Sequence, residues 1–284
     1  MTEYIKLKTG DTIPRLGMGT WFLGEKRKTR EQEIDALQGG IKAGVTLIDT
    51  AEMYGNGKSE QLIGEAINPF NREKLYLVSK VYPHNAGRGK ISRSLDHTLK
   101  RLETDYLDLY LLHWRGSIPL RETVDCMEEF VKQRKIKSWG VSNFDTDDME
   151  ELWSVPNGNH CVVNQVLYHL GSRGIEHDLL PWMIQHNVSL MAYCPLAQGG
   201  NLHKEMRNNP VLLKMAEKYG ITVMQLLLVF VLQKEHIIAI PRSGRKDHVL
   251  ANAAIQKVAL SEKDMAALNK EYPVPRTKIP LDIV

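Results

Sequence analysis

The segment LIDTAEMYG, residues 47–55, carries two side chains suited to proton transfer, Asp49 and Tyr54. Asp49 closes an apolar run that is typical of a buried strand, and the phenol of Tyr54 follows five residues later. Two further apolar runs end in the same way, LVSK on Lys80 and DLYLLH on His113. Taken alone, each residue also has a structural interpretation. His113 fits a hydrogen-bonded core histidine, Lys80 a side chain that extends out of a barrel mouth, Asp49 a turn cap and Tyr54 a packing aromatic.

An acid, a phenol, a lysine and an imidazole in one cleft would form a proton-donating site. Asp49 and Lys80 would each be costly to bury alone, so we expect them to pair with each other. A positive Lys80 beside Tyr54 would stabilise the ionised phenol and lower its pKa from about 10. A phenol with such a pKa could protonate an oxyanion as it develops.

Short β-rich runs, separated by helical patterns, must position these residues. The runs are RLGMGT (15–20), LIDT (47–50), LYLVSK (75–80), YLDLYLLH (106–113), SWGVS (138–142), VVNQV (162–166), VSLMAY (188–193) and IIAIP (237–241). Most starts lie 24 to 32 residues apart, which is the length of one β-loop-α-loop unit. Eight such units predict an α/β fold, a single (β/α)8 TIM-type barrel domain over residues 1–284 whose strand ends meet at one mouth. A doubly wound sheet is the alternative, but no G-x-G-x-x-G follows a strand.

Three other segments complete the predicted fold. YIKLKTGDTIPRLG, residues 4–17, alternates around a Thr-Gly-Asp turn and predicts an N-terminal β-hairpin that caps the bottom of the barrel. A helix is predicted over residues 29–43, from Thr29 to a stop at Gly44. The apolar run LLLVFVL, residues 226–232, is too short for a membrane span and predicts a buried helix.

Composition and charge exclude several functions. The formal net charge is only +3, and the basic run EKRKTR at 25–30 fits a solvated loop and helix start, so we expect no nucleic-acid partner. Cys126, Cys161 and Cys194 are widely separated, and no signal-peptide pattern opens the chain. These features predict a cytoplasmic protein with reduced thiols, no metal site and no membrane association. Nothing marks an interface, so we expect a monomer or weak oligomer.

The motifs LIDTAEMYG, LVSK, DLYLLHW, GVSNF, VVNQVLYH, AYCPLAQGG and IPRSG together closely resemble those of the aldo-keto reductases. The matches run in family order from about residue 5 to residue 260. The resemblance implies an oxidoreductase of the EC 1.1.1 class that reduces aldehydes, ketones or dicarbonyls to alcohols by hydride transfer from NADPH, without a metal. It implies Tyr54 as the proton donor, Lys80 as the residue that lowers its pKa, Asp49 as the partner of Lys80, and His113 as the residue that orients the carbonyl.

The resemblance also implies a set of cofactor contacts. Ser142, Asn143 and Gln165 would clamp the carboxamide, since amides pair with amides, and Tyr193 would stack on the nicotinamide ring. Arg242 and Ser243 would hold the adenosine 2′-phosphate, with a solvated loop face as the alternative for this basic segment. The other cofactor positions implied are Gly19, Thr20, Trp21, Asp49, Leu196, Ala197, Gln198, Ile240, His248 and Asn252.

Three positions depart from the family pattern. His248 stands where many members carry an arginine on the adenine and phosphate, and Ala251 stands where many carry a glutamate. Cys194 occupies a position where serine is common. A neutral imidazole offsets less phosphate desolvation than a guanidinium does, so we expect NADPH to be preferred, with NADH use possible.

The implied substrate pocket is aromatic. Its residues would be Trp21, Tyr54, Tyr82, His113 and Trp114, with Met53 as a further candidate. Such walls favour small aldehydes, ketones or dicarbonyls, including ring-bearing ones. The tail after Glu271, YPVPRTKIPLDIV, is short, and we expect it to leave the site open and permissive.

Two other functions stay open on the sequence. One is a Schiff-base lyase with Lys80 as the nucleophile, although Asp49 should keep that lysine charged. The other is an NADPH-binding sensory or auxiliary subunit with slow turnover, although the complete set of Asp49, Tyr54, Lys80 and His113 argues for catalysis.

Overall fold

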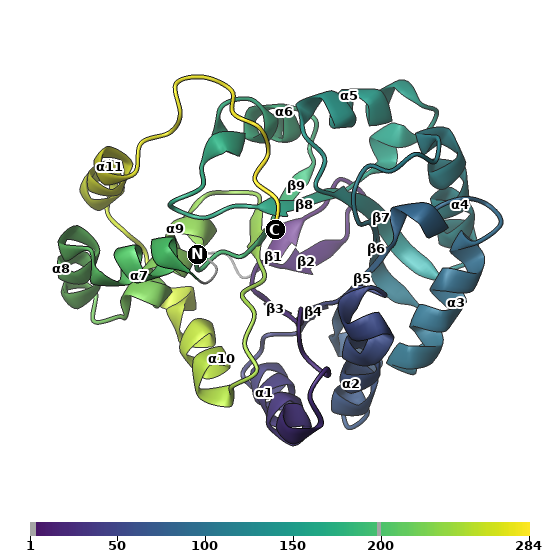
Figure 1. Cartoon of the computed structure of the whole chain (residues 1–284), viewed down its shortest axis with the longest axis horizontal. Helices are drawn as coiled ribbons and strands as arrows, with labels where there is room; N and C mark the ends of the chain where they lie inside the picture. Colours follow the sequence, from purple (N-terminus) through teal and green to yellow (C-terminus); the bar gives the residue numbers. More distant parts are fainter. Residues whose placement is uncertain (1–3, 198–199) are drawn as a thin grey trace.

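Eight parallel strands form a barrel in the computed structural model, which describes residues 4–197 and 200–284 (Figure 1). The strands are β3 (Gly17–Gly19), β4 (Leu47–Asp49), β5 (Tyr76–Val81), β6 (Leu107–Leu112), β7 (Ile136–Ser142), β8 (Val163–Leu167), β9 (Ser189–Tyr193) and β10 (Ile237–Ala239). Each pairs in parallel with its neighbour in sequence. The predicted TIM-type barrel is confirmed.

The barrel closes where β10 meets β3. Bridges join Leu16 to Ala239 and Gly19 to Arg242, and the Gly19 amide donates to the Pro241 carbonyl over 3.1 Å. A Cβ at Gly19 would lie 2.8 Å from the Ile240 carbonyl oxygen, so this close approach requires glycine. The closure brings the first and last strand ends to the same mouth.

Helices surround the barrel and cover its strands. They are α1 (Arg30–Lys42), α2 (Lys58–Ile67), α3 (Ile91–Leu102), α4 (Leu120–Lys132), α5 (Thr146–Ser154), α6 (Leu179–Gln185), α7 (Asn201–Asn208), α8 (Pro210–Lys218), α9 (Val223–Gln233), α10 (Lys246–Ala253) and α11 (Glu262–Glu271). The run 226–232 lies in α9 and is wholly buried, as predicted. Helix α1 begins one residue after the predicted start at Thr29, whose hydroxyl donates to Glu33 over 2.8 Å and makes no side-chain cap.

Apolar side chains fill two layers, one inside the barrel and one between strands and helices. Along β6, Leu109 and Leu111 belong to the inner layer, while Tyr110 and Leu112 belong to the outer one. Both faces of a strand are therefore buried, which explains why the strands read as continuous apolar runs.

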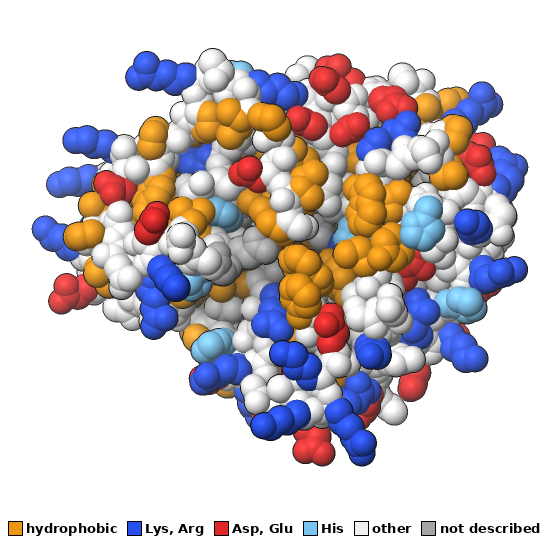
Figure 2. All heavy atoms as spheres, viewed as in Figure 1, with side chains coloured by type: hydrophobic (Ala, Val, Ile, Leu, Met, Phe, Trp, Pro, Cys, Tyr) orange, Lys and Arg blue, Asp and Glu red, His pale blue; other side chains and the backbone are white. Residues whose placement is uncertain are grey.

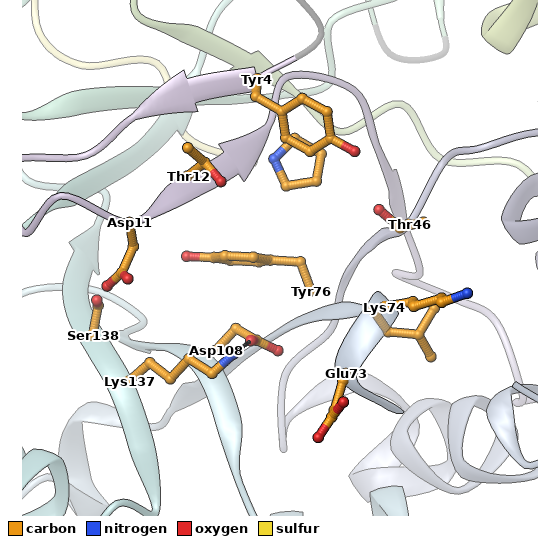
Figure 3. A pocket seen from close by; sticks show the side chains of 12 residues that line it. Tyr4, Asp11, Thr12, Thr46, Glu73, Lys74, Tyr76, Asp108, Lys137 and Ser138 are labelled. Carbon is orange, nitrogen blue, oxygen red and sulfur yellow. Dashed lines mark ion pairs between the residues drawn. The ribbon is translucent and has the colours of Figure 1, made fainter. Parts of the chain in front are cut away.

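The predicted hairpin forms from β1 (Tyr4–Lys6) and β2 (Thr12–Pro14), which pair antiparallel. Its buried residues Ile5, Leu7 and Ile13 join the inner layer of the barrel. Between the hairpin and the N-terminal ends of β5, β6 and β7 lies a cavity of about 540 Å³ (Figure 3). The hairpin thus caps the barrel bottom and leaves the opposite mouth free for a site.

Within the described ranges, no single helix is long and apolar enough to cross a membrane. Helices α8 and α9 reach the required length and hydropathy only as a pair, and an 80° bend separates them.

Candidate active site

Strand ends at the C-terminal mouth converge on one cavity. It is about 100 Å³ in volume, and its lining is Gly19, Thr20, Trp21, Asp49, Met53, Tyr54, His113, Ser142, Asn143, Gln165, Tyr193, Cys194, Ile240, Arg242 and Val284. Most of the residues expected at a cofactor or substrate site therefore lie together, although they come from segments more than 200 residues apart.

Lys80 is the centre of a buried hydrogen-bonded cluster behind this cavity. Its side chain has no exposed surface, and its Nζ donates over 2.8 Å to Asp49 Oδ2, over 2.8 Å to the Thr50 carbonyl and over 3.1 Å to the Tyr54 hydroxyl. The other carboxylate oxygen of Asp49 accepts from Gln165 Nε2 over 2.8 Å. The three donors of the ammonium group are all used, and the expected pairing of Asp49 with Lys80 is present.

A left-handed turn places Tyr54 against Lys80. The three residues after it have positive φ angles, Gly55 at 56°, Asn56 at 54° and Gly57 at 86°. Glycine and asparagine tolerate this conformation better than other residues. The chain therefore reverses tightly after Tyr54, before α2 begins at Lys58.

The pKa of Tyr54 differs from the expectation. Burial raises this pKa well above 10, and the negative charge of Asp49 raises it further. Asp49 pairs with Lys80 at 2.8 Å and so balances the charge that was expected to act on the phenol. The prediction that Lys80 lowers the Tyr54 pKa below about 10 is therefore wrong. Tyr54 holds its proton firmly.

His113 is neutral at ordinary pH. Burial, together with the charge of Lys80, lowers its pKa to about 2. Its ring meets Tyr54 edge-on, with centroids 5.8 Å apart. Among the described residues, its buried Nδ1 has no hydrogen-bond partner. His113 also lines the cavity, so its imidazole can present a ring N–H to a polar ligand atom there.

Amide side chains and a phenol form a second hydrogen-bonded set. Ser142 Oγ donates to the Gln165 carbonyl over 2.8 Å, and the Tyr193 hydroxyl donates to Asn143 Oδ1 over 2.8 Å. Asn143 Nδ2 is 3.2 Å from Ser142 Oγ. These bonds fix the orientation of the Tyr193 ring, which is half-buried in the cavity wall.

The basic segment after β10 contributes one side chain to the cavity. Arg242 lines it, and its Nε donates to the Trp21 carbonyl over 3.0 Å. Arg245 and Lys246 instead form exposed ion pairs with Asp247 and Asp35. The solvated-loop interpretation therefore fits these two residues, while Arg242, which is also exposed, lines the cavity as well.

Several residues expected to contact the cofactor lie outside the lining of the cavity. Among the described residues, these cofactor positions are Leu196, Ala197, Ser243, His248 and Asn252. Asn252 is buried in α10, and His248 is exposed on the same helix. Gln198 falls outside the described residues.

Aromatic side chains stand at the rim of the cavity. Trp21 is 6.4 Å from Tyr54 between ring centroids, while Tyr82 and Trp114 meet edge-on at 5.6 Å without lining the cavity. Figure 2 shows hydrophobic side chains gathered near the centre of this face. The rim is aromatic, as predicted, but Tyr82 and Trp114 belong to its outer part.

Sequence reasoning missed three contributors. Phe22 stacks on Trp21 at 4.4 Å, is half-exposed and has a φ of 65°, which is rare for a bulky residue. Glu52 accepts from the Tyr82 amide over 2.7 Å and so holds the loop that carries Tyr82. Val284, in the tail, lines the cavity. The short tail therefore reaches the cavity, and an open, permissive site stays a prediction.

Comparison with known proteins agrees with this arrangement. The profile of the Aldo/keto reductase family matches residues 15–272. The chain is 50% identical over 277 residues to methylglyoxal reductase YeaE of Escherichia coli, covering 97% of both chains. It is 33% identical over 279 residues to glyoxal reductase of Bacillus subtilis, covering 96% of this chain and 95% of that one.

A solved structure is also similar along its whole length. It is an aldo/keto reductase from Klebsiella pneumoniae in complex with NADP and acetate, 48% identical to this chain. The TM-score is 0.97, and all of both chains is covered. The chain belongs to the aldo/keto reductase family.

Proposed function

We propose that this chain reduces small dicarbonyls, methylglyoxal above all, to the corresponding hydroxy carbonyls with NADPH. Reduction of carbonyls by NADPH is the activity of the family. The preference for a 2-oxoaldehyde is supported by the names of the relatives at 50% and 33% identity, a methylglyoxal reductase and a glyoxal reductase.

The observation that carries the mechanism is the contact of Lys80 with both Asp49 and Tyr54. The Tyr54 hydroxyl lies 3.1 Å from an ammonium group that a carboxylate fixes from the other side. A phenol in this position can give up its proton and leave a phenolate that the ammonium stabilises.

The lining residues fit a nicotinamide cofactor. Tyr193 offers a fixed flat ring, and Gln165, whose nitrogen is bonded to Asp49, keeps an amide oxygen for a carboxamide. Arg242 offers a guanidinium to a phosphate at the side of the cavity. When bound, NADPH supplies a hydride from C4 of its nicotinamide.

The protein residues then guide the proton. Neutral His113 can donate an N–H to the carbonyl oxygen and so hold it beside Tyr54. As the carbonyl carbon gains the hydride, its oxygen becomes an alkoxide, which is a stronger base than a phenolate. Tyr54 gives its proton to that oxygen despite its raised pKa, and the bond from Lys80 stabilises the phenolate that remains. The high pKa keeps the proton on Tyr54 until this moment.

We further propose that residues 1–284 act as one barrel domain, as a monomer or weak oligomer in the cytoplasm. The described strands all belong to the barrel or to its hairpin. The three cysteines are free thiols, which suits a reducing compartment. Size-exclusion chromatography with light scattering tests the oligomeric state.

Initial rates with NADPH and NADH test the function on a panel of methylglyoxal, glyoxal, aromatic aldehydes and sugars. We expect the highest kcat/KM with methylglyoxal and NADPH, and slower turnover with NADH. Tight NADPH binding without turnover of any carbonyl would contradict the proposal and favour a sensory subunit.

A further inference from the structure

The tail after α11 crosses the mouth of the barrel. Residues 273–284 form no helix or strand, and the chain runs back over the barrel and ends near its centre (Figure 1). Val284 lines the active-site cavity, and its backbone amide faces the Tyr193 hydroxyl. The end of the described chain is therefore a wall of the pocket.

Apolar packing of this tail is sparse. Ile279 packs over Gly174, where a Cβ would lie 2.7 Å from Ile279 Cγ1, and Leu281 is half-buried against the core. Ile283 and Val284 are 60% and 51% exposed. Polar contacts must therefore contribute much of what fixes the position of the tail.

Lys278 makes the main charged contact of the tail. Its Nζ lies 2.8 Å from Asp178 Oδ2 and 3.4 Å from Asp145 Oδ1. Nearer the end, Ser172 Oγ donates to the Asp282 carboxylate. Two anchors thus flank Ile279 and Leu281.

The two carboxylates that contact Lys278 also accept hydrogen bonds from backbone amides at the starts of helices. Asp145 caps α5 and accepts from the Thr146 amide over 2.7 Å. Asp178 caps α6 and accepts from the Leu179 amide over 2.9 Å. Asp145 lies two residues after Asn143, which bonds Tyr193 in the pocket. Lys278 therefore fixes the tail to the same framework that fixes the cofactor site.

We propose that Lys278 is a positioning residue that sets substrate size. By holding the tail on the caps of α5 and α6, it keeps Val284 in the pocket wall and favours small carbonyls over ring-bearing ones. This inference rests on the proposed reduction of dicarbonyls, and it assigns the size preference of that site to one ion-paired lysine far from the reacting atoms.

The test compares Lys278→Met with Lys278→Arg, which restores the charge. Lys263→Met is the control, because Lys263 is exposed on α11 and has no ion pair among the described residues. The substrates are methylglyoxal and its aromatic analogue phenylglyoxal, at saturating NADPH. Hydrogen exchange of the peptide that spans residues 273–284 reports the tail directly.

In Lys278→Met we expect the KM for methylglyoxal to rise about fivefold, because the lost interaction is a partly exposed ion pair of Lys278 with two carboxylates. The kcat should change by less than about twofold. The kcat/KM ratio of phenylglyoxal to methylglyoxal should rise by a similar factor. Tail amides should exchange faster, and NADPH affinity should stay the same. Lys278→Arg should restore wild-type values, and Lys263→Met should keep them.

Faster exchange with an unchanged substrate ratio would overturn the assignment of size selection to Lys278. Unchanged exchange would overturn its role in holding the tail, as would equal effects in Lys263→Met. If the wild-type protein reduced neither dicarbonyl, the proposed function would fail, and the exchange rates alone would decide whether Lys278 positions the tail.

Discussion

The two ends of the barrel carry similar residues in different arrangements. At the C-terminal mouth, Asp49, Lys80 and Tyr54 lie at a cavity of about 100 Å³. At the N-terminal end, Asp108, Lys137 and Tyr76 line the larger cavity of about 540 Å³ (Figure 3). Each end thus has an acid, a lysine and a phenol. Neither residue type nor cavity size distinguishes a site for chemistry from one that stabilises the fold.

The position of the lysine makes the difference. Lys80 is fully buried and contacts both the carboxylate and the phenol. Lys137 is half-exposed and pairs with Asp108 over 2.7 Å, and Asp108 also accepts from Arg72 and from the Leu77 amide.

No cation contacts the bottom phenol among the described residues. Figure 3 shows the Tyr76 hydroxyl pointing toward the side of the cavity that holds Asp11. Burial, Asp108 and Asp11 all raise the pKa of Tyr76. The pKa values of Tyr54 and Tyr76 are thus both raised, but only Tyr54 has an ammonium group, 3.1 Å away, that can stabilise the phenolate once its proton is given up. The bottom set holds strands together, as is usual for this end of a barrel.

The largest difference in kcat between the two ends should appear when the tyrosine hydroxyl at each end is removed in a separate variant. Tyr54→Phe should lower kcat for methylglyoxal by roughly 10³-fold, since the proton donor is lost, while the NADPH Kd stays the same. Tyr76→Phe should leave kcat within about twofold. Steady-state rates and fluorescence titration with NADPH measure both. Comparable losses of kcat in the two variants would remove the distinction between the ends.

Substitution of the aspartate at each end should affect activity at the mouth and stability at the bottom of the barrel. Asp49→Asn should lower kcat by roughly 10²-fold, because Lys80 loses the charge that fixes it. Asp108→Asn should keep kcat but lower the free energy of unfolding by about 1–3 kcal/mol, through weaker bonds to Arg72 and Lys137. Urea unfolding and initial rates of both proteins provide the comparison. An Asp49→Asn protein with wild-type kcat would show that the ion pair is only structural.

Substitution of one basic residue at each end should affect the KM for NADPH only at the mouth. Arg242→Ala should raise the KM for NADPH roughly tenfold and leave that for NADH nearly unchanged, because only NADPH carries the 2′-phosphate. Lys137→Ala at the barrel bottom should alter neither value. Equal increases for both cofactors in Arg242→Ala would exclude a contact with that phosphate.

The smallest effect concerns the pH dependence of stability. The pKa of His113 is about 2 in the folded protein and near 6.5 when unfolded, so between these values the unfolded state binds more protons. Stability should therefore fall as pH drops below about 6.5, and His113→Gln should reduce that fall. Tm measured at pH 7 and at pH 5 for both proteins tests this. Identical pH slopes would mean that His113 is not buried in its neutral form.

Much of the site could be predicted because parallel strands end at a common mouth. Asp49, Lys80, His113, Gln165 and Tyr193 each follow or end an apolar run, so their convergence follows from the barrel. The Tyr54 pKa could not be predicted, because burial depends on packing from every side. The position of the tail could not be predicted either, because Lys278 contacts helix-capping aspartates that lie more than 90 residues away in the sequence.

The most direct test of the central claim is a single turnover with enzyme already saturated with NADPH. After mixing with methylglyoxal, the wild-type and Tyr76→Phe proteins should lose one equivalent of NADPH absorbance. Tyr54→Phe should show no loss over the same time, although it binds NADPH. Equal loss in Tyr54→Phe would contradict the claim that the proton comes from Tyr54 at the mouth.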